Sequence, residues 1–281
     1  MKVADVITNR IIDKLNEGVV PWQKSWSGGN EWPKNLVSKK GYRGVNALML
    51  SMAGFGSPYW VTFKQCSDLG GTVTKGQHGM PVLFYTWLND KSDLEHERKI
   101  PFMRFYKVFN TEQCTGIDVA KIPTVVARSE NERLEACEAV IAGMKLRPEI
   151  KHSGSVASYS PTLDYVNMPK METFNSSENY YSVLFHELTH STGNAKRLAR
   201  KEFEGNCFGS ESYSKEELVA ELGAAFLCSH CGIDNTTIDQ SASYIQSWIK
   251  RLKNDKTLII SASGLAQKST DFILGKTFGE E

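Results

Sequence analysis

Apolar residues along the first half of the chain recur with two different periods, which predict its elements. They recur at helical spacing over residues 3–15, and a second apolar helix runs through residues 48–52. Two runs rich in aromatic and branched side chains, residues 81–87 and 102–109, predict strands. Residues 1–125 are therefore expected to form an α+β domain, with two or three helices against a small antiparallel sheet.

The pattern of the second half, residues 126–281, is more helical and predicts a second domain. A strongly apolar helix is expected to end at Gly193, with Ser176, Ser177 or Asn179 as candidate caps at its start. Short strands are expected before it, around residues 155–160 and 164–168. Further helices are predicted over residues 131–144, 214–226, 243–252 and 266–273. The fold class is therefore α+β, in two domains.

The most specific chemical pattern lies in that apolar helix, as His186-Glu187-Leu188-Thr189-His190. Residues four apart share one helix face, so both imidazoles can reach one metal ion. Glu187 can then act as a general base on a water bound to that ion. A chance match normally falls on an exposed helix, whereas two histidines and an acid are costly to bury in an apolar run without a shared partner. The motif therefore predicts a metal site with Glu187 as its catalytic residue.

A third ligand is expected from the helix that begins with Ser214 as its N-cap. Glu217 and Glu221 are four residues apart there, so one can bind the ion and the other can accept the free N–H of a ligating imidazole. Their pattern resembles the Glu-x-x-x-Asp helix of gluzincin metallopeptidases. By that resemblance Glu217 is the metal ligand and Glu221 supports an imidazole, with Glu221 kept as the alternative ligand. Zinc is the expected ion, and manganese or cobalt would also fit two histidines and one glutamate.

Charge and cysteine content narrow the class of protein. The net charge of the 281 residues is +1. However, residues 1–128 carry 17 basic against 11 acidic residues, and residues 129–281 carry 16 against 21. A basic front and an acidic back are expected when one domain binds a polyanion. The six cysteines are scattered along the chain and no secretory signal is found, which predicts a cytoplasmic protein. No run of 18 apolar residues occurs, so no membrane segment is expected. The pair Cys228 and Cys231 has no second pair to complete a metal site.

Aromatic rings and cations are interleaved through the front half, outside any pattern of zinc finger, homeodomain or basic zipper. Bases of a single strand stack on aromatic faces while lysine and arginine neutralise the phosphates. The alternative to DNA binding is that the tryptophans fill a core. The candidate residues for binding single-stranded DNA are Trp22, Lys24, Lys39, Lys40, Tyr42, Arg43, Asn46, Trp60, Lys64 and Lys75.

Motifs in both halves occur in an order that resembles a known family. The front half contains Val6-Ile7, Val20-Pro21-Trp22, Tyr42-Arg43-Gly44-Val45-Asn46, Tyr59-Trp60-Val61-Thr62-Phe63 and Val73-x-Lys75-Gly76. The back half continues the metal motif through Ser191-Thr192-Gly193 and Arg197-Leu198. This series resembles the ArdC family of antirestriction proteins, and the same domain pair occurs in polyvalent proteins of phages and conjugative elements.

The resemblance implies a domain that binds single-stranded DNA, followed by a zincin-like metallopeptidase domain. It implies protection of incoming plasmid or phage DNA from host restriction, in a bacterial cell that the protein could enter together with that DNA. The expected partners are single-stranded DNA and a protein substrate, such as a host restriction component. The alternative is a DNA-binding protective protein whose metal site is structural or catalytically idle.

Overall fold

The computed structural model describes residues 3–22, 32–89, 99–124, 128–200, 211–235 and 242–276. It has two domains of α+β type, as the sequence predicts. The front half contains α1 (Val3–Asn16), β1 (Lys34–Asn35), α2 (Val45–Ser51), β2 (Tyr59–Thr62), α3 (Phe63–Asp68), β3 (Thr72–Val73), β4 (Met80–Asn89), β5 (Lys99–Asn110) and β6 (Cys114–Thr115).

The front sheet has the order β1-β2-β5-β4 and is antiparallel except for the short parallel pair β1 and β2. Strands β4 and β5 form its long hairpin, in register from the pair Met80 and Val108 to the pair Asn89 and Lys99. Both predicted strands of this domain are therefore confirmed, and each is longer than its apolar run. Helix α2 lies against β4 and closes one face of the sheet.

The back half is mostly helical. It contains α4 (Glu130–Gly143), β7 (Glu149–His152), β8 (Ser158–Ser160), β9 (Tyr165–Met168), α5 (Ser177–Ser191), α6 (Glu211–Cys231), α7 (Ala242–Asn254) and α8 (Leu258–Ile273). Its three strands have the order β7-β9-β8, with β8 at an edge and antiparallel to β9. The sequence did not predict β7, because Ile150 is the only aliphatic residue in that strand.

Two helix starts differ from the prediction. Helix α6 begins at Glu211, so Ser214 lies inside its first turn and is not its N-cap, and the predicted capping box with Glu217 is wrong. Helix α8 begins at Leu258, eight residues before the predicted start. By contrast, Ser176 caps α5 as one of the three candidates, since its hydroxyl accepts a hydrogen bond from the backbone N–H of Asn179 at 3.2 Å.

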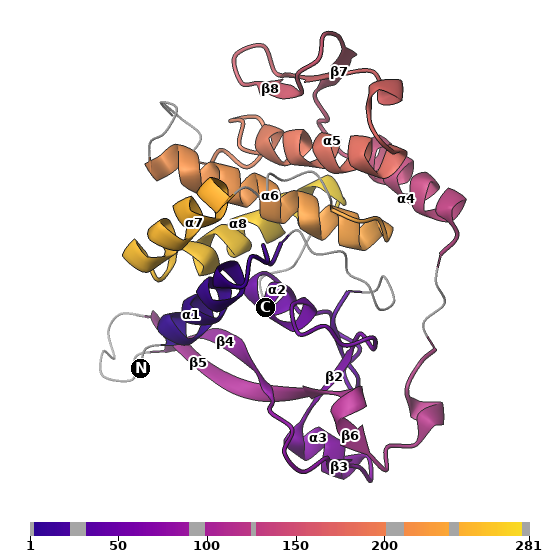
Figure 1. Ribbon diagram of the computed structural model, residues 1–281, viewed down its shortest axis with the longest axis vertical. Helices are drawn as coiled ribbons and strands as arrows, with labels where there is room; N and C mark the ends of the chain where they lie inside the picture. The colour runs from indigo at the N-terminus through magenta and orange to yellow at the C-terminus, as the bar shows by residue number, and fades with distance from the viewer. Residues whose placement is uncertain are drawn as a thin grey trace.

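The elements stack in layers along the long axis of the molecule (Figure 1). The β7-β9-β8 sheet packs on α5, α5 packs on α6, and α6 packs on α8. Next come α1 and α2, which contact α7 and α8 respectively, and then the front sheet. None of the described helices is both long and apolar enough to cross a bilayer.

One of the hydrophobic clusters is built by side chains from both the front and the back half. From α1, Ile7 and Ile11 enter the same buried cluster as Phe226 of α6, Trp248 of α7 and Ile259 of α8. These side chains are at most 3% exposed. Because α1 and α2 are buried against helices of the second half, the front domain helps to support the helices that carry the metal motif.

Candidate metal centre

Helix α5 holds the two histidines of the motif on one face. His186 and His190 are one turn apart, and their Nε2 atoms lie 3.0 Å from each other. The helix is anchored beneath them, because Phe185, Leu188 and Thr189 are completely buried. The imidazoles are partly exposed, at 22% and 12%. The local sequence therefore aims two nitrogen ligands at one point, with access from solvent.

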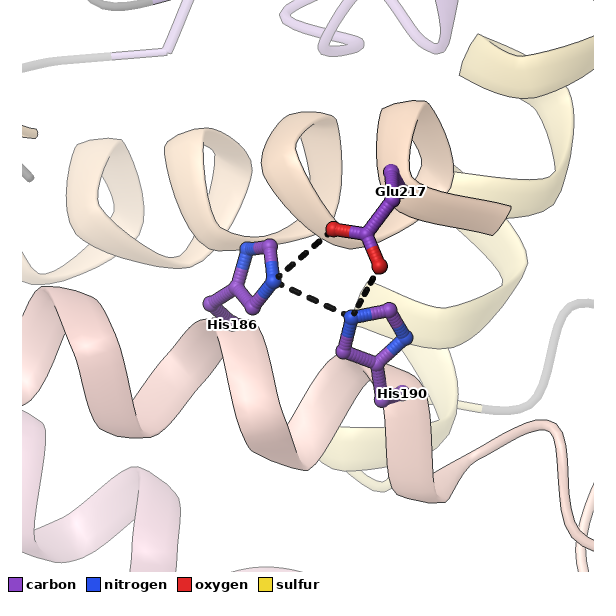
Figure 2. A group of neighbouring side chains, drawn as sticks. All are labelled: His186, His190 and Glu217. Atoms are coloured by element: carbon purple, nitrogen blue, oxygen red, sulfur yellow. Dashed lines mark hydrogen bonds and ion pairs between the residues drawn. The ribbon is translucent and has the colours of Figure 1, made fainter. Parts of the chain in front are cut away.

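Helix α6 brings Glu217 to the same point (Figure 2). Its Oε2 lies 3.7 Å from Nε2 of His186, and its Oε1 lies 3.6 Å from Nε2 of His190. Among the described residues, these three side chains form the one group of potential metal ligands. The expected trio is thus brought together, and Glu221 is not part of it.

The donor groups of His186, His190 and Glu217 form a triangle whose size suits a metal site. Ligands about 2.1 Å from a tetrahedral ion lie about 3.4 Å apart along each edge. The two imidazole nitrogens lie 3.0 Å apart, one Glu217 oxygen lies 3.6 Å from His190 and the other lies 3.7 Å from His186. One donor atom from each residue lies within 4.8 Å of the other two. Two imidazole nitrogens and a carboxylate leave the fourth position open, as at a catalytic rather than a structural site. The donor set and its spacing therefore fit a divalent cation.

A close approach of α5 and α6 makes this triangle possible. Gly223 lies beside Thr189, and a Cβ atom at Gly223 would be only 2.4 Å from the Thr189 methyl carbon. Glycine removes this obstacle, so the axes of the two helices can come close. The glycine lies six residues after Glu217, and Thr189 lies between the two histidines. Helix spacing at this contact therefore controls how far Glu217 stands from His190.

We expect Gly223→Ala to weaken metal binding. The added methyl overpacks the interface at a cost of about 1–3 kcal/mol, which outweighs the gain in helix propensity of about 1 kcal/mol. The measurements are the melting temperature and the Kd for Mn(II). Thr189→Ala in the same chain removes the clashing atoms and is expected to restore binding.

Gly264→Ala is the matched control for that change, since Gly264 is also helical and its Cβ would meet no atom within 4 Å. Unchanged Mn(II) affinity in the Gly223 variant would contradict the role of the close approach.

Glu216, which the sequence analysis did not single out, supports His190. Its Oε1 lies 3.4 Å from Nδ1 of His190, so the nitrogen that does not face Glu217 can donate to a carboxylate. Arg200 binds both oxygens of Glu216, through Nη2 to Oε1 and through Nε to Oε2 at 3.0 Å. The guanidinium also donates to Thr189 O at 3.1 Å. The neighbouring acid at 216, rather than the one at 221, therefore orients an imidazole.

These contacts shift the pKa values of the pair. Burial alone would lower the pKa of His190, but the hydrogen bond to Glu216 and the charges of Glu217 and Glu187 raise it. Burial alone would raise the pKa of Glu216, but His190 and Arg200 outweigh it and lower the pKa. Glu216 is thus held as a carboxylate, the form that accepts the imidazole N–H.

Removing that carboxylate should destabilise the protein. Glu216→Gln leaves the Arg200 side chain, 3% exposed, without its charge partner. Breaking a buried pair in this way costs about 3–5 kcal/mol. Chemical denaturation measures the change, and Arg200→Met in the same chain should recover part of the loss. A variant as stable as the wild type would contradict the pairing.

Glu187 follows His186 on α5 and is 9% exposed. Its charge reaches His190, as the raised pKa of that imidazole indicates. An acid at this position stands beside the two nitrogen ligands without being one of the three convergent groups. That is the arrangement expected of a base next to a metal ion.

Glu221 has a different role from the one predicted. The residue is 6% exposed, and its carboxylate is held between the two halves: Oε2 accepts from Nε1 of Trp22 in the front half at 2.5 Å, and Oε1 accepts from the hydroxyl of Tyr244 on α7 at 2.5 Å. Burial raises its pKa to about 7, against the lowering effects of Tyr244, His186 and Trp22. With both oxygens engaged by Trp22 and Tyr244, Glu221 is not positioned as the alternative ligand.

Two predicted DNA-binding tryptophans lie in the core. Trp22 is 0% exposed and meets the Trp248 ring edge to face at 5.9 Å, and Trp60 of β2 is 2% exposed in a cluster with Leu50, Val82 and Val108. A base cannot stack on either ring unless the core opens. For Trp22 and Trp60 the alternative is therefore correct: these tryptophans fill a core.

Three further candidates serve the fold. The Asn46 side chain pairs with the backbone of Leu83, donating to its O at 2.8 Å and accepting from its N at 2.6 Å. Arg43 forms an ion pair with Asp271 of α8. Tyr42 is partly buried, and burial raises its pKa to about 12. These residues join the front sheet to the helical layers.

The lysines remain at the surface. Lys39, Lys40, Lys64 and Lys75 are exposed, although Lys64 pairs with Asp68 at 2.7 Å and Nζ of Lys39 lies over the Tyr59 ring at 5.5 Å. Lys24 lies outside the described residues. Of the ten candidates for DNA binding, these exposed lysines are still accessible to a phosphate backbone.

Exposed aromatic residues on the hairpin are further candidates for DNA binding that the sequence pattern does not reveal. Phe84 and Phe105 are 40% and 43% exposed, Tyr106 is 38% exposed, and the Arg104 guanidinium lies over the Phe84 ring at 5.4 Å. Lys107 follows on the same strand and is exposed. Because side chains alternate along a strand and Phe84 pairs with Arg104, the side chains of Phe84, Arg104 and Tyr106 lie on one face of the hairpin, and those of Phe105 and Lys107 lie on the other. We call Phe84, Arg104 and Tyr106 the hairpin strip. The sequence pattern predicts a strand here but does not say which of its rings face solvent.

Comparison with known proteins agrees with both halves of this picture. Residues 1–109 match the family model described as the N-terminal domain of anti-restriction factor ArdC, and residues 135–265 match the model of a zincin-like metallopeptidase. The crystal structure of the antirestriction ArdC protein from the R388 plasmid is 35% identical, with a TM-score of 0.79 for the metal-free form over 97% of both chains. The Mn(II)-bound form gives 0.78 over 98% of both chains.

Curated relatives extend the comparison. The uncharacterized protein y4eC of Sinorhizobium fredii (strain NBRC 101917 / NGR234) is 34% identical over 95% of this chain and 90% of its own length. The DNA primase TraC of Escherichia coli is 32% identical over 95% of this chain, which spans only 26% of that longer protein. The two domain matches and the structural likeness over the whole length show that this chain belongs to the ArdC antirestriction family, with a zincin-like domain whose donor set supports a divalent metal.

Proposed function

We propose that the protein binds single-stranded DNA through its front domain and hydrolyses a peptide bond at the metal centre, and that it thereby protects incoming DNA from host restriction. The convergence of His186, His190 and Glu217 within 4.8 Å of one another carries the catalytic half of the proposal. Zinc is the proposed ion, with manganese or cobalt as substitutes. The protective role requires the bacterial cytoplasm, where incoming DNA meets restriction enzymes.

The catalytic residues would divide the work as follows. His186, His190 and Glu217 would hold a divalent ion, which would supply Lewis-acid chemistry by polarising a carbonyl and lowering the pKa of water. Glu187 takes the proton from the attacking water and delivers it to the leaving amine. Glu216 holds the tautomer of His190 by accepting its Nδ1–H.

An extended peptide has an edge to bind beside this centre. Strand β8 is one of the two edge strands of its sheet as described, and it contacts α5, the helix of the two histidines. A substrate strand can pair with such an edge through backbone hydrogen bonds. The Tyr159 hydroxyl on β8 is already engaged, since it donates to Asp164 at 2.8 Å. We therefore give Tyr159 a structural role.

The DNA-binding half of the proposal relies on the surface of the front domain. The hairpin strip offers the rings of Phe84 and Tyr106 for base stacking, with the Arg104 cation on the same face, and exposed Lys39, Lys40 and Lys75 offer phosphate contacts. Family membership supports DNA as the partner. A host restriction component is the proposed protein substrate.

The test combines DNA binding with protection in cells. Gel-shift titration should give a lower Kd for a single-stranded oligonucleotide than for the same sequence as a duplex, and preference for the duplex would overturn the first half. Cells that carry Glu187→Gln should lose protection of incoming plasmid DNA. Full protection by that variant, with DNA binding intact, would favour the alternative function, a DNA-binding shield whose metal site is idle.

A further inference from the structure

One residue of the front domain is hydrogen-bonded toward both helices that carry the metal ligands. Trp22 follows α1 in the chain and is completely buried among side chains of α6 and α7. Its indole N–H donates to Glu221 at 2.5 Å. Glu221 lies one helical turn after Glu217 on α6, so this bond fixes the turn adjacent to the carboxylate ligand.

The backbone of Trp22 is linked to the other helix through one side chain. Its carbonyl oxygen accepts from Nδ2 of Asn235 at 2.9 Å, and Oδ1 of Asn235 accepts from the Ser182 hydroxyl at 2.6 Å. Ser182 lies one helical turn before His186 on α5. Asn235 and Ser182 are both 0% exposed, so water does not compete for these bonds.

Trp22 therefore connects the turn beside His186 to the turn beside Glu217. The metal site needs the spacing between those two helices to be held within a few tenths of an ångström, because ligand distances vary little. We propose that Trp22 is a positioning residue of the metal centre, through which the front domain fixes the spacing of α5 and α6. This role depends on the metal site proposed above.

Tyr244 of α7 completes the arrangement. Its hydroxyl donates to the second oxygen of Glu221, so the carboxylate is held from two sides. A buried carboxylate that lost the indole N–H would have to find another donor, and the turn of α6 that carries it would shift. Such a shift would be passed to Glu217 because both residues belong to one rigid helix.

The test measures metal binding by the full chain with Trp22 replaced by phenylalanine. Trp22→Phe keeps a ring in the core and removes only the N–H donor and part of the volume. We expect the Kd for Mn(II) to rise about tenfold, at the lower end of the 10–100-fold loss typical for residues that orient ligands. The visible absorption of bound Co(II) should also change, since it reports the geometry around the ion.

Trp60→Phe is the matched control, because Trp60 of β2 is also buried, at 2% exposed, but belongs to a separate cluster in the front domain. It should lower stability while leaving the Mn(II) affinity and the Co(II) absorption as in the wild type. Glu221→Gln tests the same bond from its other end and serves if Trp22→Phe does not fold. Both variants should disturb the Co(II) absorption, and the double variant should be no worse than the more severe single change.

Two results would overturn the proposal in distinguishable ways. If the wild type binds Mn(II) and Co(II) and the folded variants at Trp22 and Glu221 bind them with unchanged affinity and absorption, the positioning role is wrong and the metal site stands. If the wild type binds neither ion, the proposed metal site is wrong, and the positioning role falls with it.

Discussion

Glu187→Gln is expected to lower peptide hydrolysis by about 10²–10⁴-fold while the chain keeps its metal. Glutamine has nearly the shape of glutamate but cannot take a proton from water. Glu187 is 9% exposed and lies outside the group of three convergent ligands, so its replacement should leave the ion in place. Cleavage of a library of bacterial peptides, followed by mass spectrometry, measures the loss for whichever peptide sequences the wild type cuts.

Glu178→Gln is the control for this change. Glu178 lies in the first turn of the same helix, where it pairs with Arg133 at 3.4 Å, two turns before His186. The substitution Glu178→Gln removes the same charge from α5 at a point away from the metal centre. The activity of this variant should stay near that of the wild type. The metal content of the Glu187→Gln variant is measured in the same sample. If the metal-loaded variant cleaves peptides as fast as the wild type, Glu187 is not part of the mechanism.

The second large effect is expected for Glu217→Gln, which should weaken metal binding by more than about 100-fold. Loss of a residue that only orients a ligand costs about 10–100-fold, and Glu217 contributes one of the three donor groups itself. The amide is neutral, so the attraction between the carboxylate and a dication is lost as well. Competition with a coloured chelator measures the Kd for Zn(II) and Mn(II).

Two comparisons make this result decisive. Glu135→Gln removes an exposed charge from α4 and should leave the Kd unchanged. Glu221→Gln should weaken binding less than Glu217→Gln, because Glu221 faces Trp22 and Tyr244. The reverse order of effects would exchange the roles of the two glutamates and contradict the geometry of α6.

Helix periodicity explains why the sequence was sufficient for the centre of the site. The spacing of His186 and His190 alone places both imidazoles on one face, and any α-helix would do so. The strand and helix patterns gave the α+β class and the start of α5 at its Ser176 cap for the same local reason. The division of the chain at residues 125 and 126 stays a prediction.

Which acid faces which partner was decided by the packing of α5 against α6. Residues 216, 217 and 221 are all glutamates on one helix, and their sequence does not say which of them meets Arg200, the ion or Trp22. Gly223 sets how close the helices come, and Thr189 is the residue it meets. Neither fact can be derived from periodicity, because both depend on a contact between segments about 30 residues apart.

In the front domain, too, the sequence predicts the residue types and the tertiary packing decides which of them are buried. Its rings and cations were visible in the sequence, but the burial of Trp22 and Trp60 and the exposure of Phe84 and Phe105 were not. The sequence by itself determined the candidate ligand types, their helical spacing and the family. Only the tertiary structure decided which aromatic residues fill the core shared by the two halves, because burial depends on what a distant segment packs against a side chain.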